Sequence, residues 1–146
     1  MSDFTQIKKI SQAHDKTIWC LKWLGPNSGY FASASEDTII KIWDTRVFKF
    51  IRRLIGHSEG VRSLEILTDG RLVSTSLYNL KIWNLNLATV DHSQSVQILD
   101  EFRSIKLLNN GDLAIVGVKP IILFWTLLNP NNQLSITSNN VPAFNT

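Results

Sequence analysis

The sequence predicts an all-β protein made of about three β-propeller blades, each a sheet of four antiparallel strands, arranged as an incomplete ring. The first observation is a repeat, because Trp43, Trp83 and Trp125 follow one another at intervals of 40 and 42 residues. This spacing is typical of one propeller blade. The second observation is that each repeat holds short runs rich in Val, Ile, Trp and Phe, separated by turn sequences such as Asp69-Gly70 and Asn110-Gly111. Such turns predict hairpins between antiparallel strands.

The repeats divide the chain into successive segments. These are an outer strand of a neighbouring blade (1–12), blade 1 (13–55), blade 2 (56–99), a degenerate blade 3 (100–137) and a tail (138–146). Within each blade, three apolar runs lead up to the repeated Trp. A fourth, more polar run follows it and predicts the outer strand of that blade, at Phe48–Leu54, Val96–Leu99 and Leu134–Thr137. The run Phe4–Ile10 predicts the strand of the neighbouring blade.

The composition is that of a globular domain. Hydrophobic residues make up 44% and charged residues 18% of the chain, and the net charge is +3. The Lys and Arg residues are scattered, so no basic block predicts nucleic-acid binding. The longest apolar run, Ile121–Trp125, is too short for a membrane span. With no secretory signal at the start and with Cys20 as the one cysteine, we expect a cytoplasmic protein, the nucleus being the alternative.

The two ends of the repeat resemble the WD-repeat family. The residues that carry the resemblance are Ala13-His14 and Gly56-His57 at the start, and Trp43-Asp44 and Trp83-Asn84 at the end. The third repeat keeps the strand pattern and Trp125. The resemblance covers about residues 4–137 and implies a propeller that binds other proteins or peptides. It also implies that the chain is not an enzyme and needs no cofactor. From the scattered charges and the short apolar runs, we expect neither nucleic acid nor a membrane as a partner.

His14, Ser33 and Asp37 have the residue types of a hydrolase triad. The family resemblance implies instead that these three residues and Trp43 form a buried, hydrogen-bonded structural tetrad. An indole N–H only donates, hydroxyl and neutral imidazole groups donate and accept, and a carboxylate only accepts, so a linear chain satisfies all four groups. No Gly-x-Ser-x-Gly elbow is present. We therefore favour the structural role, and a serine hydrolase is a distant alternative.

The tetrad becomes less complete in each successive repeat. The residues at the equivalent positions are His57, Ser74, Leu77 and Trp83 in the second repeat, and Ile115, Lys119 and Trp125 in the third. Blade 3 therefore has to hold its Trp by apolar packing. The three His residues and the one Cys lack the spacing of metal ligands, so no metal site is predicted.

A protein-interaction rim is implied by the family resemblance at the entry of each inner strand. Its members are Thr17, Trp19, Glu36, Arg62, Glu101 and Arg103. Trp and Arg are the residue types that dominate binding hot spots. For Trp19, core packing between blades is the alternative interpretation. The two open faces of an incomplete ring further predict either self-association or membership of a longer propeller.

Trp43, Asp44 and Arg46 resemble the WDxR box of substrate receptors of cullin-RING ubiquitin ligases. In that family the Arg contacts the adaptor of the ligase. Two residues of the box are already set by the repeat, so a chance match is the alternative interpretation. The leading hypothesis is accordingly a non-catalytic protein-interaction scaffold, the second a ligase substrate receptor, and the third a serine hydrolase.

Overall fold

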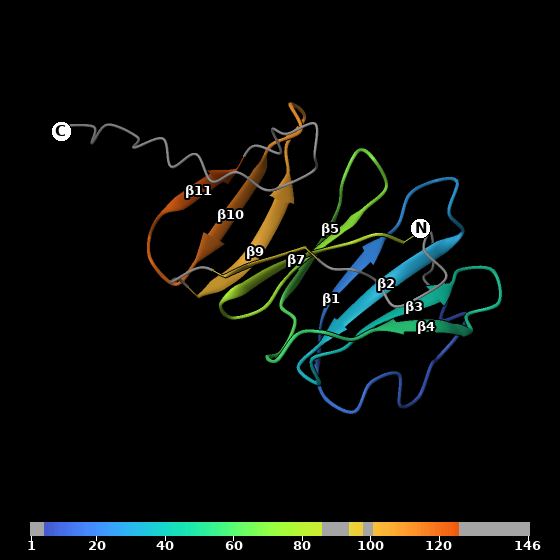
Figure 1. The fold of residues 1–146 in the computed structure, drawn as a ribbon. Helices are drawn as coiled ribbons and strands as arrows, with labels where there is room; N and C mark the ends of the chain where they lie inside the picture. Colours follow the sequence, from blue (N-terminus) through green and yellow to red (C-terminus); the bar gives the residue numbers. More distant parts are fainter. Residues whose placement is uncertain (1–4, 86–93, 98–100, 126–146) are drawn as a thin grey trace, which may run out of the picture.

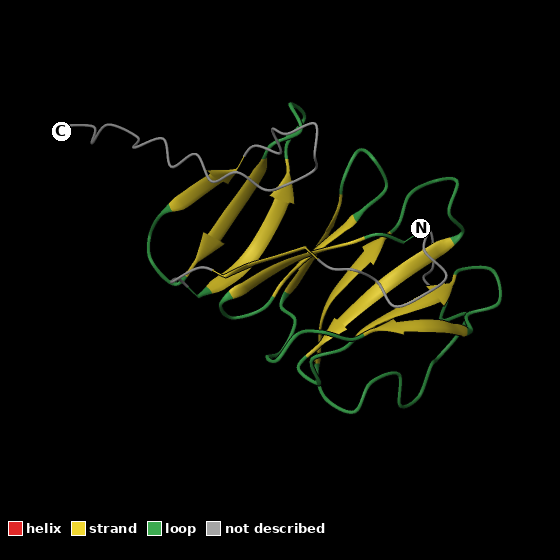
Figure 2. Cartoon of the chain, in the orientation of Figure 1, coloured by secondary structure: helices red, strands yellow, loops and turns green. Residues whose placement is uncertain are grey.

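The computed structural model describes residues 5–85, 94–97 and 101–125, and these ranges contain eleven strands and no helix (Figure 2). The strands form three separate antiparallel sheets. In Figure 1 the sheets fan out side by side, with β5–β8 between the other two, and the described strands do not close a ring. The predicted fold class, an incomplete set of all-β propeller blades, is confirmed.

Blades 1 and 2 are complete four-stranded sheets. Blade 1 contains β1 (Ile18–Trp23), β2 (Tyr30–Ser35), β3 (Ile40–Asp44) and β4 (Phe50–Leu54). Blade 2 contains β5 (Ser63–Ile66), β6 (Leu72–Thr75), β7 (Asn79–Trp83) and β8 (Gln94–Gln97). Within each of these two blades, every strand pairs with the next one along the chain.

Blade 3 has three described strands, β9 (Phe102–Leu107), β10 (Leu113–Gly117) and β11 (Ile122–Trp125). The outer strand predicted at 134–137 and the tail lie outside the described residues. Residues 5–10 form no strand. Because an outer strand of another blade would pair within that blade, the assignment of this segment stays a prediction.

The hydrophobic core consists of two layers, one at each junction between blades. The first contains Ala32, Ile40, Ile42, Leu64, Leu72 and Trp83 among its buried residues. The second contains Val73, Ile82, Phe102, Ile105, Leu113 and Trp125 among its buried residues. Blade 2 is thus buried on both faces, which explains why its strands do not alternate between polar and apolar residues. The first strands of the blades, β1, β5 and β9, approach one another along the inner edge of the fan.

Candidate functional site

The four side chains of the blade 1 tetrad are brought together between strands β2 and β3. Trp43 Nε1 donates a hydrogen bond to Ser33 Oγ at 2.8 Å, and that oxygen lies 2.6 Å from His14 Nε2. His14 Nδ1 lies 2.8 Å from Asp37 Oδ2. A neutral imidazole with its proton on Nδ1 satisfies every group, because each side chain then donates to the next.

The tetrad is closed to substrates. Ser33 is only 2% exposed, and its single oxygen already engages both Trp43 and His14. Burial raises the pKa of Asp37, but hydrogen bonds from His14 and from two backbone amides outweigh this effect and hold it below its usual value. A nucleophilic serine needs space for a carbonyl carbon and donors for the oxyanion. The geometry therefore suits a structural clamp.

Blade 2 keeps part of the same arrangement. Trp83 Nε1 donates to Ser74 Oγ at 2.7 Å, and His57 Nε2 lies 2.6 Å from that oxygen. The other ring nitrogen, His57 Nδ1, is buried and has no hydrogen-bond partner among the described residues. Burial, followed by the nearby Lys81 ammonium, lowers the pKa of His57 to about 4. The imidazole is therefore neutral at pH 7.

Blade 3 holds its tryptophan without the Ser–His pair. Trp125 is buried, and its ring lies 6.4 Å from that of Phe102 in an edge-to-face arrangement. Ile115, at the position of the tetrad serine, is also fully buried in the same core. Lys119, at the position of the tetrad aspartate, is exposed. An apolar cluster replaces the polar clamp in this blade.

On the rim, Trp19 and Arg62 form one unit at the junction of blades 1 and 2. The Arg62 guanidinium carbon lies 4.8 Å from the centre of the Trp19 ring, which is a cation–π contact. Gly60 lies beneath the same ring, because a Cβ placed there would be 2.5 Å from Trp19 Cζ3 and 3.0 Å from the Glu36 Cα. Trp19 nevertheless remains 39% exposed. It therefore packs between the blades and also presents part of its ring to solvent.

The other rim residues are distributed around this unit. The backbone N–H of Glu36 donates to the Thr17 carbonyl at 2.9 Å, and the Glu36 carboxylate lies 3.9 Å from the Lys16 ammonium. In blade 3, Arg103 and Glu101 form a separate ion pair at 3.8 Å. The structure thus gathers Trp19, Arg62 and Glu36 at one junction, while Glu101 and Arg103 pair with each other on blade 3.

Asp44 is the last residue of β3, and Arg46 lies in the turn between β3 and β4. Both are at the end of blade 1 opposite the rim, because the antiparallel register pairs Asp44 with Tyr30 and Ile18 with Ser35. Asp44 Oδ1 accepts the Arg46 backbone N–H at 2.7 Å, and Oδ2 accepts from Arg46 Nη2 at 2.8 Å. These bonds from Arg46 lower the pKa of Asp44 to about 2. Arg46 Nε also donates to Asp44 Oδ1, at 3.4 Å, and the Arg46 side chain remains 75% exposed.

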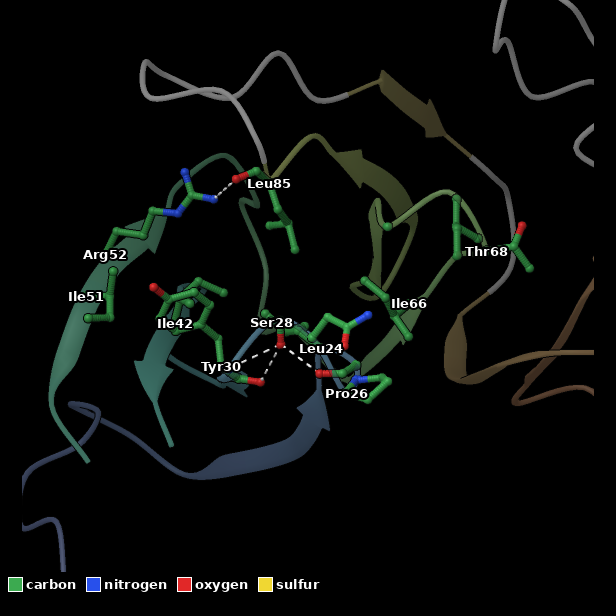
Figure 3. A pocket seen from close by; sticks show the side chains of 14 residues that line it. Leu24, Pro26, Ser28, Tyr30, Ile42, Ile51, Arg52, Ile66, Thr68 and Leu85 are labelled. Atoms are coloured by element: carbon green, nitrogen blue, oxygen red, sulfur yellow. Dashed lines mark hydrogen bonds between the residues drawn. The ribbon is translucent and has the colours of Figure 1, made fainter. Parts of the chain in front are cut away.

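A groove of about 870 Å³ opens between blades 1 and 2. Figure 3 shows Ile51 and Arg52 on one side and Ile66 and Thr68 on the other, with Leu24 and Pro26 at its base. Arg52 Nη2 donates to the Leu85 carbonyl at 2.5 Å and so links the two blades. The groove lies at the same end of the blades as Arg46, because the turn after β1 lines it.

Two further features concern metal binding and helices that could span a membrane. Within the described ranges, no group of three or more His, Cys, Asp and Glu side chains is placed to hold a metal ion. In the same ranges, no helix has the length and apolar character needed to cross a membrane.

The comparisons with known proteins agree on one family. The family model described as WD domain, G-beta repeat, matches residues 5–44 and 48–84. The chain is similar to the human DDB1- and CUL4-associated factor 10, with 35% identity over 58% of this chain and 15% of the relative. It is also similar to mitochondrial division protein 1 of Neurospora crassa, with 30% identity over 76% of this chain and 17% of the relative.

A solved structure has the same fold. The WD40 beta propeller domain of Doa1 matches with a TM-score of 0.73 and 22% identity, covering 84% of this chain and 41% of the solved chain. This chain thus spans less than a fifth of the length of the two curated relatives named above.

Proposed function

Because this chain belongs to the WD-repeat family, we propose that it is a non-catalytic protein-interaction scaffold and part of a longer propeller. The observation that carries the proposal is the Trp19–Arg62 unit on the rim. Trp19 packs into the junction between blades, and 39% of this residue remains exposed to solvent. Tryptophan and arginine at a rigid site are the residues that contribute most to binding hot spots.

The chemistry of this unit favours a peptide with acidic or aromatic side chains. The Arg62 guanidinium lies over the Trp19 ring, and a guanidinium pairs well with a carboxylate. The exposed part of Trp19 offers apolar area beside that charge. Glu36 partly offsets the positive field, so we expect only a moderate dependence of binding on salt.

The buried position of Ser33 argues against the serine hydrolase alternative, because neither a substrate nor an oxyanion donor has room beside its oxygen. An esterase screen of the unmodified chain and of Ser33→Ala tests this alternative directly. Activity that disappears in Ser33→Ala while the fold is retained would restore the hydrolase hypothesis.

An alanine scan of the rim tests the proposed function. The partner is first identified by affinity purification from the native cell, and then Trp19, Arg62 and Arg103 are replaced singly. Trp19→Ala should weaken binding most, by about 2 kcal/mol, and Lys49→Ala on the exposed turn before β4 is the matched control. Because Trp19 also packs against Gly60, thermal melts accompany each variant. Arg62→Ala keeps the test decisive where Trp19→Ala unfolds, and normal binding by folded Arg62→Ala and Arg103→Ala would refute the rim.

A ligase substrate receptor is the second candidate function. It is supported by the exposed guanidinium of Arg46, held in place by Asp44, and by the similarity to DDB1- and CUL4-associated factor 10. The test is a pulldown with DDB1, in which Arg46→Ala should abolish binding while the circular dichroism spectrum stays unchanged. Lys49→Ala, in the same turn, is the control. Binding retained by Arg46→Ala, or absent with the unmodified chain, would remove this candidate.

A further inference from the structure

Each blade carries a row of three side chains that crosses its first three strands at equivalent positions. By strand register these rows are Lys22–Ala32–Ile42 in blade 1, Glu65–Val73–Ile82 in blade 2 and Lys106–Ala114–Phe124 in blade 3. The charged member always stands on the first strand, at the inner edge of the fan. The rows therefore compare the same surface in three successive blades.

The first two rows are covered and the third is open. Ala32 and Ile42 are buried in the core between blades 1 and 2, and Val73 and Ile82 in the core between blades 2 and 3. In blade 3, by contrast, Phe124 is 50% exposed and the Lys106 side chain is 72% exposed. The row of blade 3 is thus built like a surface that receives a further blade.

The charged members of the rows form a ladder across the inner strands, named here the charge ladder (Lys22, Glu65 and Lys106). Glu65 is buried and forms ion pairs with both lysines, through Oε1 with Lys22 and through Oε2 with Lys106 at 3.4 Å. Burial raises the pKa of Glu65, but the hydrogen bonds from Lys22 and from the Ile66 backbone N–H, with the charges of Lys22 and Lys106, outweigh burial and hold it below its usual value. The ladder alternates in sign and ends on blade 3 with a cation.

A second contact is repeated at both junctions between blades, and the equivalent residue of blade 3 is exposed. At the first junction, the backbone N–H of Leu64 lies close enough to the Cys20 sulfur to lower the pKa of the thiol. At the second, the equivalent N–H of Ile105 donates to Ser63 Oγ at 3.2 Å. Ser104 holds the same position in blade 3 and is exposed. An inner strand placed against blade 3 would therefore find a hydroxyl acceptor for its backbone and an ammonium for its side chain.

A second copy of this chain would fit the apolar part of this surface but not the ladder. Leu64 and Ile105 each pack onto the preceding blade, and the equivalent residue of blade 1, Leu21, is exposed. The blade 1 face of a second copy therefore has an apolar residue where one is needed. It would, however, bring its own Lys22 beside Lys106, and like charges brought together at an interface act against that pairing.

We propose that the open face of blade 3 binds a propeller blade whose inner strand carries a carboxylate next to Lys106, and that the charge ladder disfavours a second copy of this chain there. This inference rests on the proposed membership of a longer propeller, but its surface is separate from the rim, so the rim test and the test below can fail independently. The ladder would then continue its alternation of Lys and Glu into the next blade. Specificity of this kind comes from the repulsive pairing as much as from the attractive one.

The test uses a charge-exchanged form of the chain itself as the source of the complementary blade. The variant carries Lys22→Glu, Glu65→Lys and Lys106→Glu, which keeps two ion pairs inside the ladder while reversing every sign. Mixed with the unmodified chain, it brings its carboxylate at position 22 to Lys106 in one pairing, and its carboxylate at position 106 to Lys22 in the other. Association is measured by sedimentation and native mass spectrometry with differently tagged chains, after thermal melts of each chain alone.

The expected result is a mixed pair at least tenfold tighter than either self-pair, with a preference that falls as salt rises. Both chains keep a net positive charge, so bulk attraction between them does not explain such a preference. Equal affinities for mixed and self-pairs would overturn the proposal, and so would the absence of any mixed pair.

A single replacement provides a test that does not depend on folding of the triple variant. Lys106→Met keeps the length of the side chain and removes the cation from the open face. Its self-association should be several-fold tighter than that of the unmodified chain, while Lys49→Met, with the same charge change away from this face, should show no effect. Unchanged self-association in Lys106→Met would contradict a role of Lys106 in excluding a second copy.

Discussion

Blade 1 and blade 3 bury a tryptophan at the same place in the repeat by different means. In blade 1, Trp43 is held at its nitrogen by Ser33, and the bond continues to His14 and Asp37. In blade 3, Trp125 packs against Phe102 in an apolar core. The difference teaches that the repeat requires a buried tryptophan there, and that a closed hydrogen-bond network or apolar packing can each supply its surroundings.

Replacing the tryptophans should give the largest effects on stability. Trp43→Ala and Trp125→Ala should each lower the free energy of unfolding by about 3–5 kcal/mol, the scale for removing a large buried aromatic side chain. Trp43→Ala should stand at the upper end, because it also leaves the Ser33 oxygen without its indole donor. Urea unfolding followed by circular dichroism measures both. A loss in Trp125→Ala below about 1 kcal/mol would show that blade 3 does not depend on this packing.

The partial tetrad of blade 2 predicts that the free energy of unfolding depends on pH. The pKa of His57 is lowered by burial to about 4, whereas an unfolded histidine has a pKa near 6.5. The unfolded chain therefore binds this proton first, so the stabilising contribution is complete above pH 6.5 and is lost as the pH falls toward 4. The loss should reach about 3 kcal/mol, at about 1.4 kcal/mol per pH unit.

Unfolding free energies of the unmodified chain and of His57→Gln between pH 7 and pH 4 measure this effect. Glutamine can still accept from Ser74 through its amide oxygen but does not titrate in this range. The difference between the two chains should therefore shrink as the pH falls. Parallel curves for the two chains would mean that His57 does not titrate on unfolding as expected.

The carboxylate of the tetrad should have a smaller effect. Asp37→Ala should cost about 1–3 kcal/mol, because it leaves His14 Nδ1 buried and unpaired, as His57 Nδ1 already is in blade 2. The equivalent change in blade 3, Lys119→Ala, should stay within about 0.5 kcal/mol, since that side chain is exposed. Equal losses at the two positions would contradict the alignment of the repeats.

The fold was predictable from the sequence because the blade repeats its signals. The tryptophan spacing and the hairpin turns predict the three sheets. The order Trp43–Ser33–His14–Asp37 was implied by the family resemblance, and hydrogen-bonding chemistry is consistent with it. The packing of Gly60 beneath Trp19 was not predicted, because contacts between blades depend on the angle between neighbouring sheets. The charge ladder was also missed. Its signal was present, since Lys22, Glu65 and Lys106 occupy one position of the repeat, but only the packed sheets show that they meet.

The smallest expected effect concerns Cys20, and it compares the two junctions directly. The backbone N–H of Leu64 lies close enough to its sulfur to lower the pKa of the thiol, while at the next junction a serine hydroxyl accepts the equivalent N–H. Burial is the main cause that raises the pKa of the Cys20 thiol, so the group stays protonated at pH 7. Cys20→Ser should therefore change the free energy of unfolding by no more than about 0.5 kcal/mol. Cys20→Val, which replaces the sulfur beside the Leu64 N–H by an apolar side chain, should cost about 1–2 kcal/mol if this N–H depends on an acceptor as the equivalent one does at the next junction. If serine costs as much as valine, the thiol acts through its packing volume, and the two junctions are not built on the same hydrogen bond.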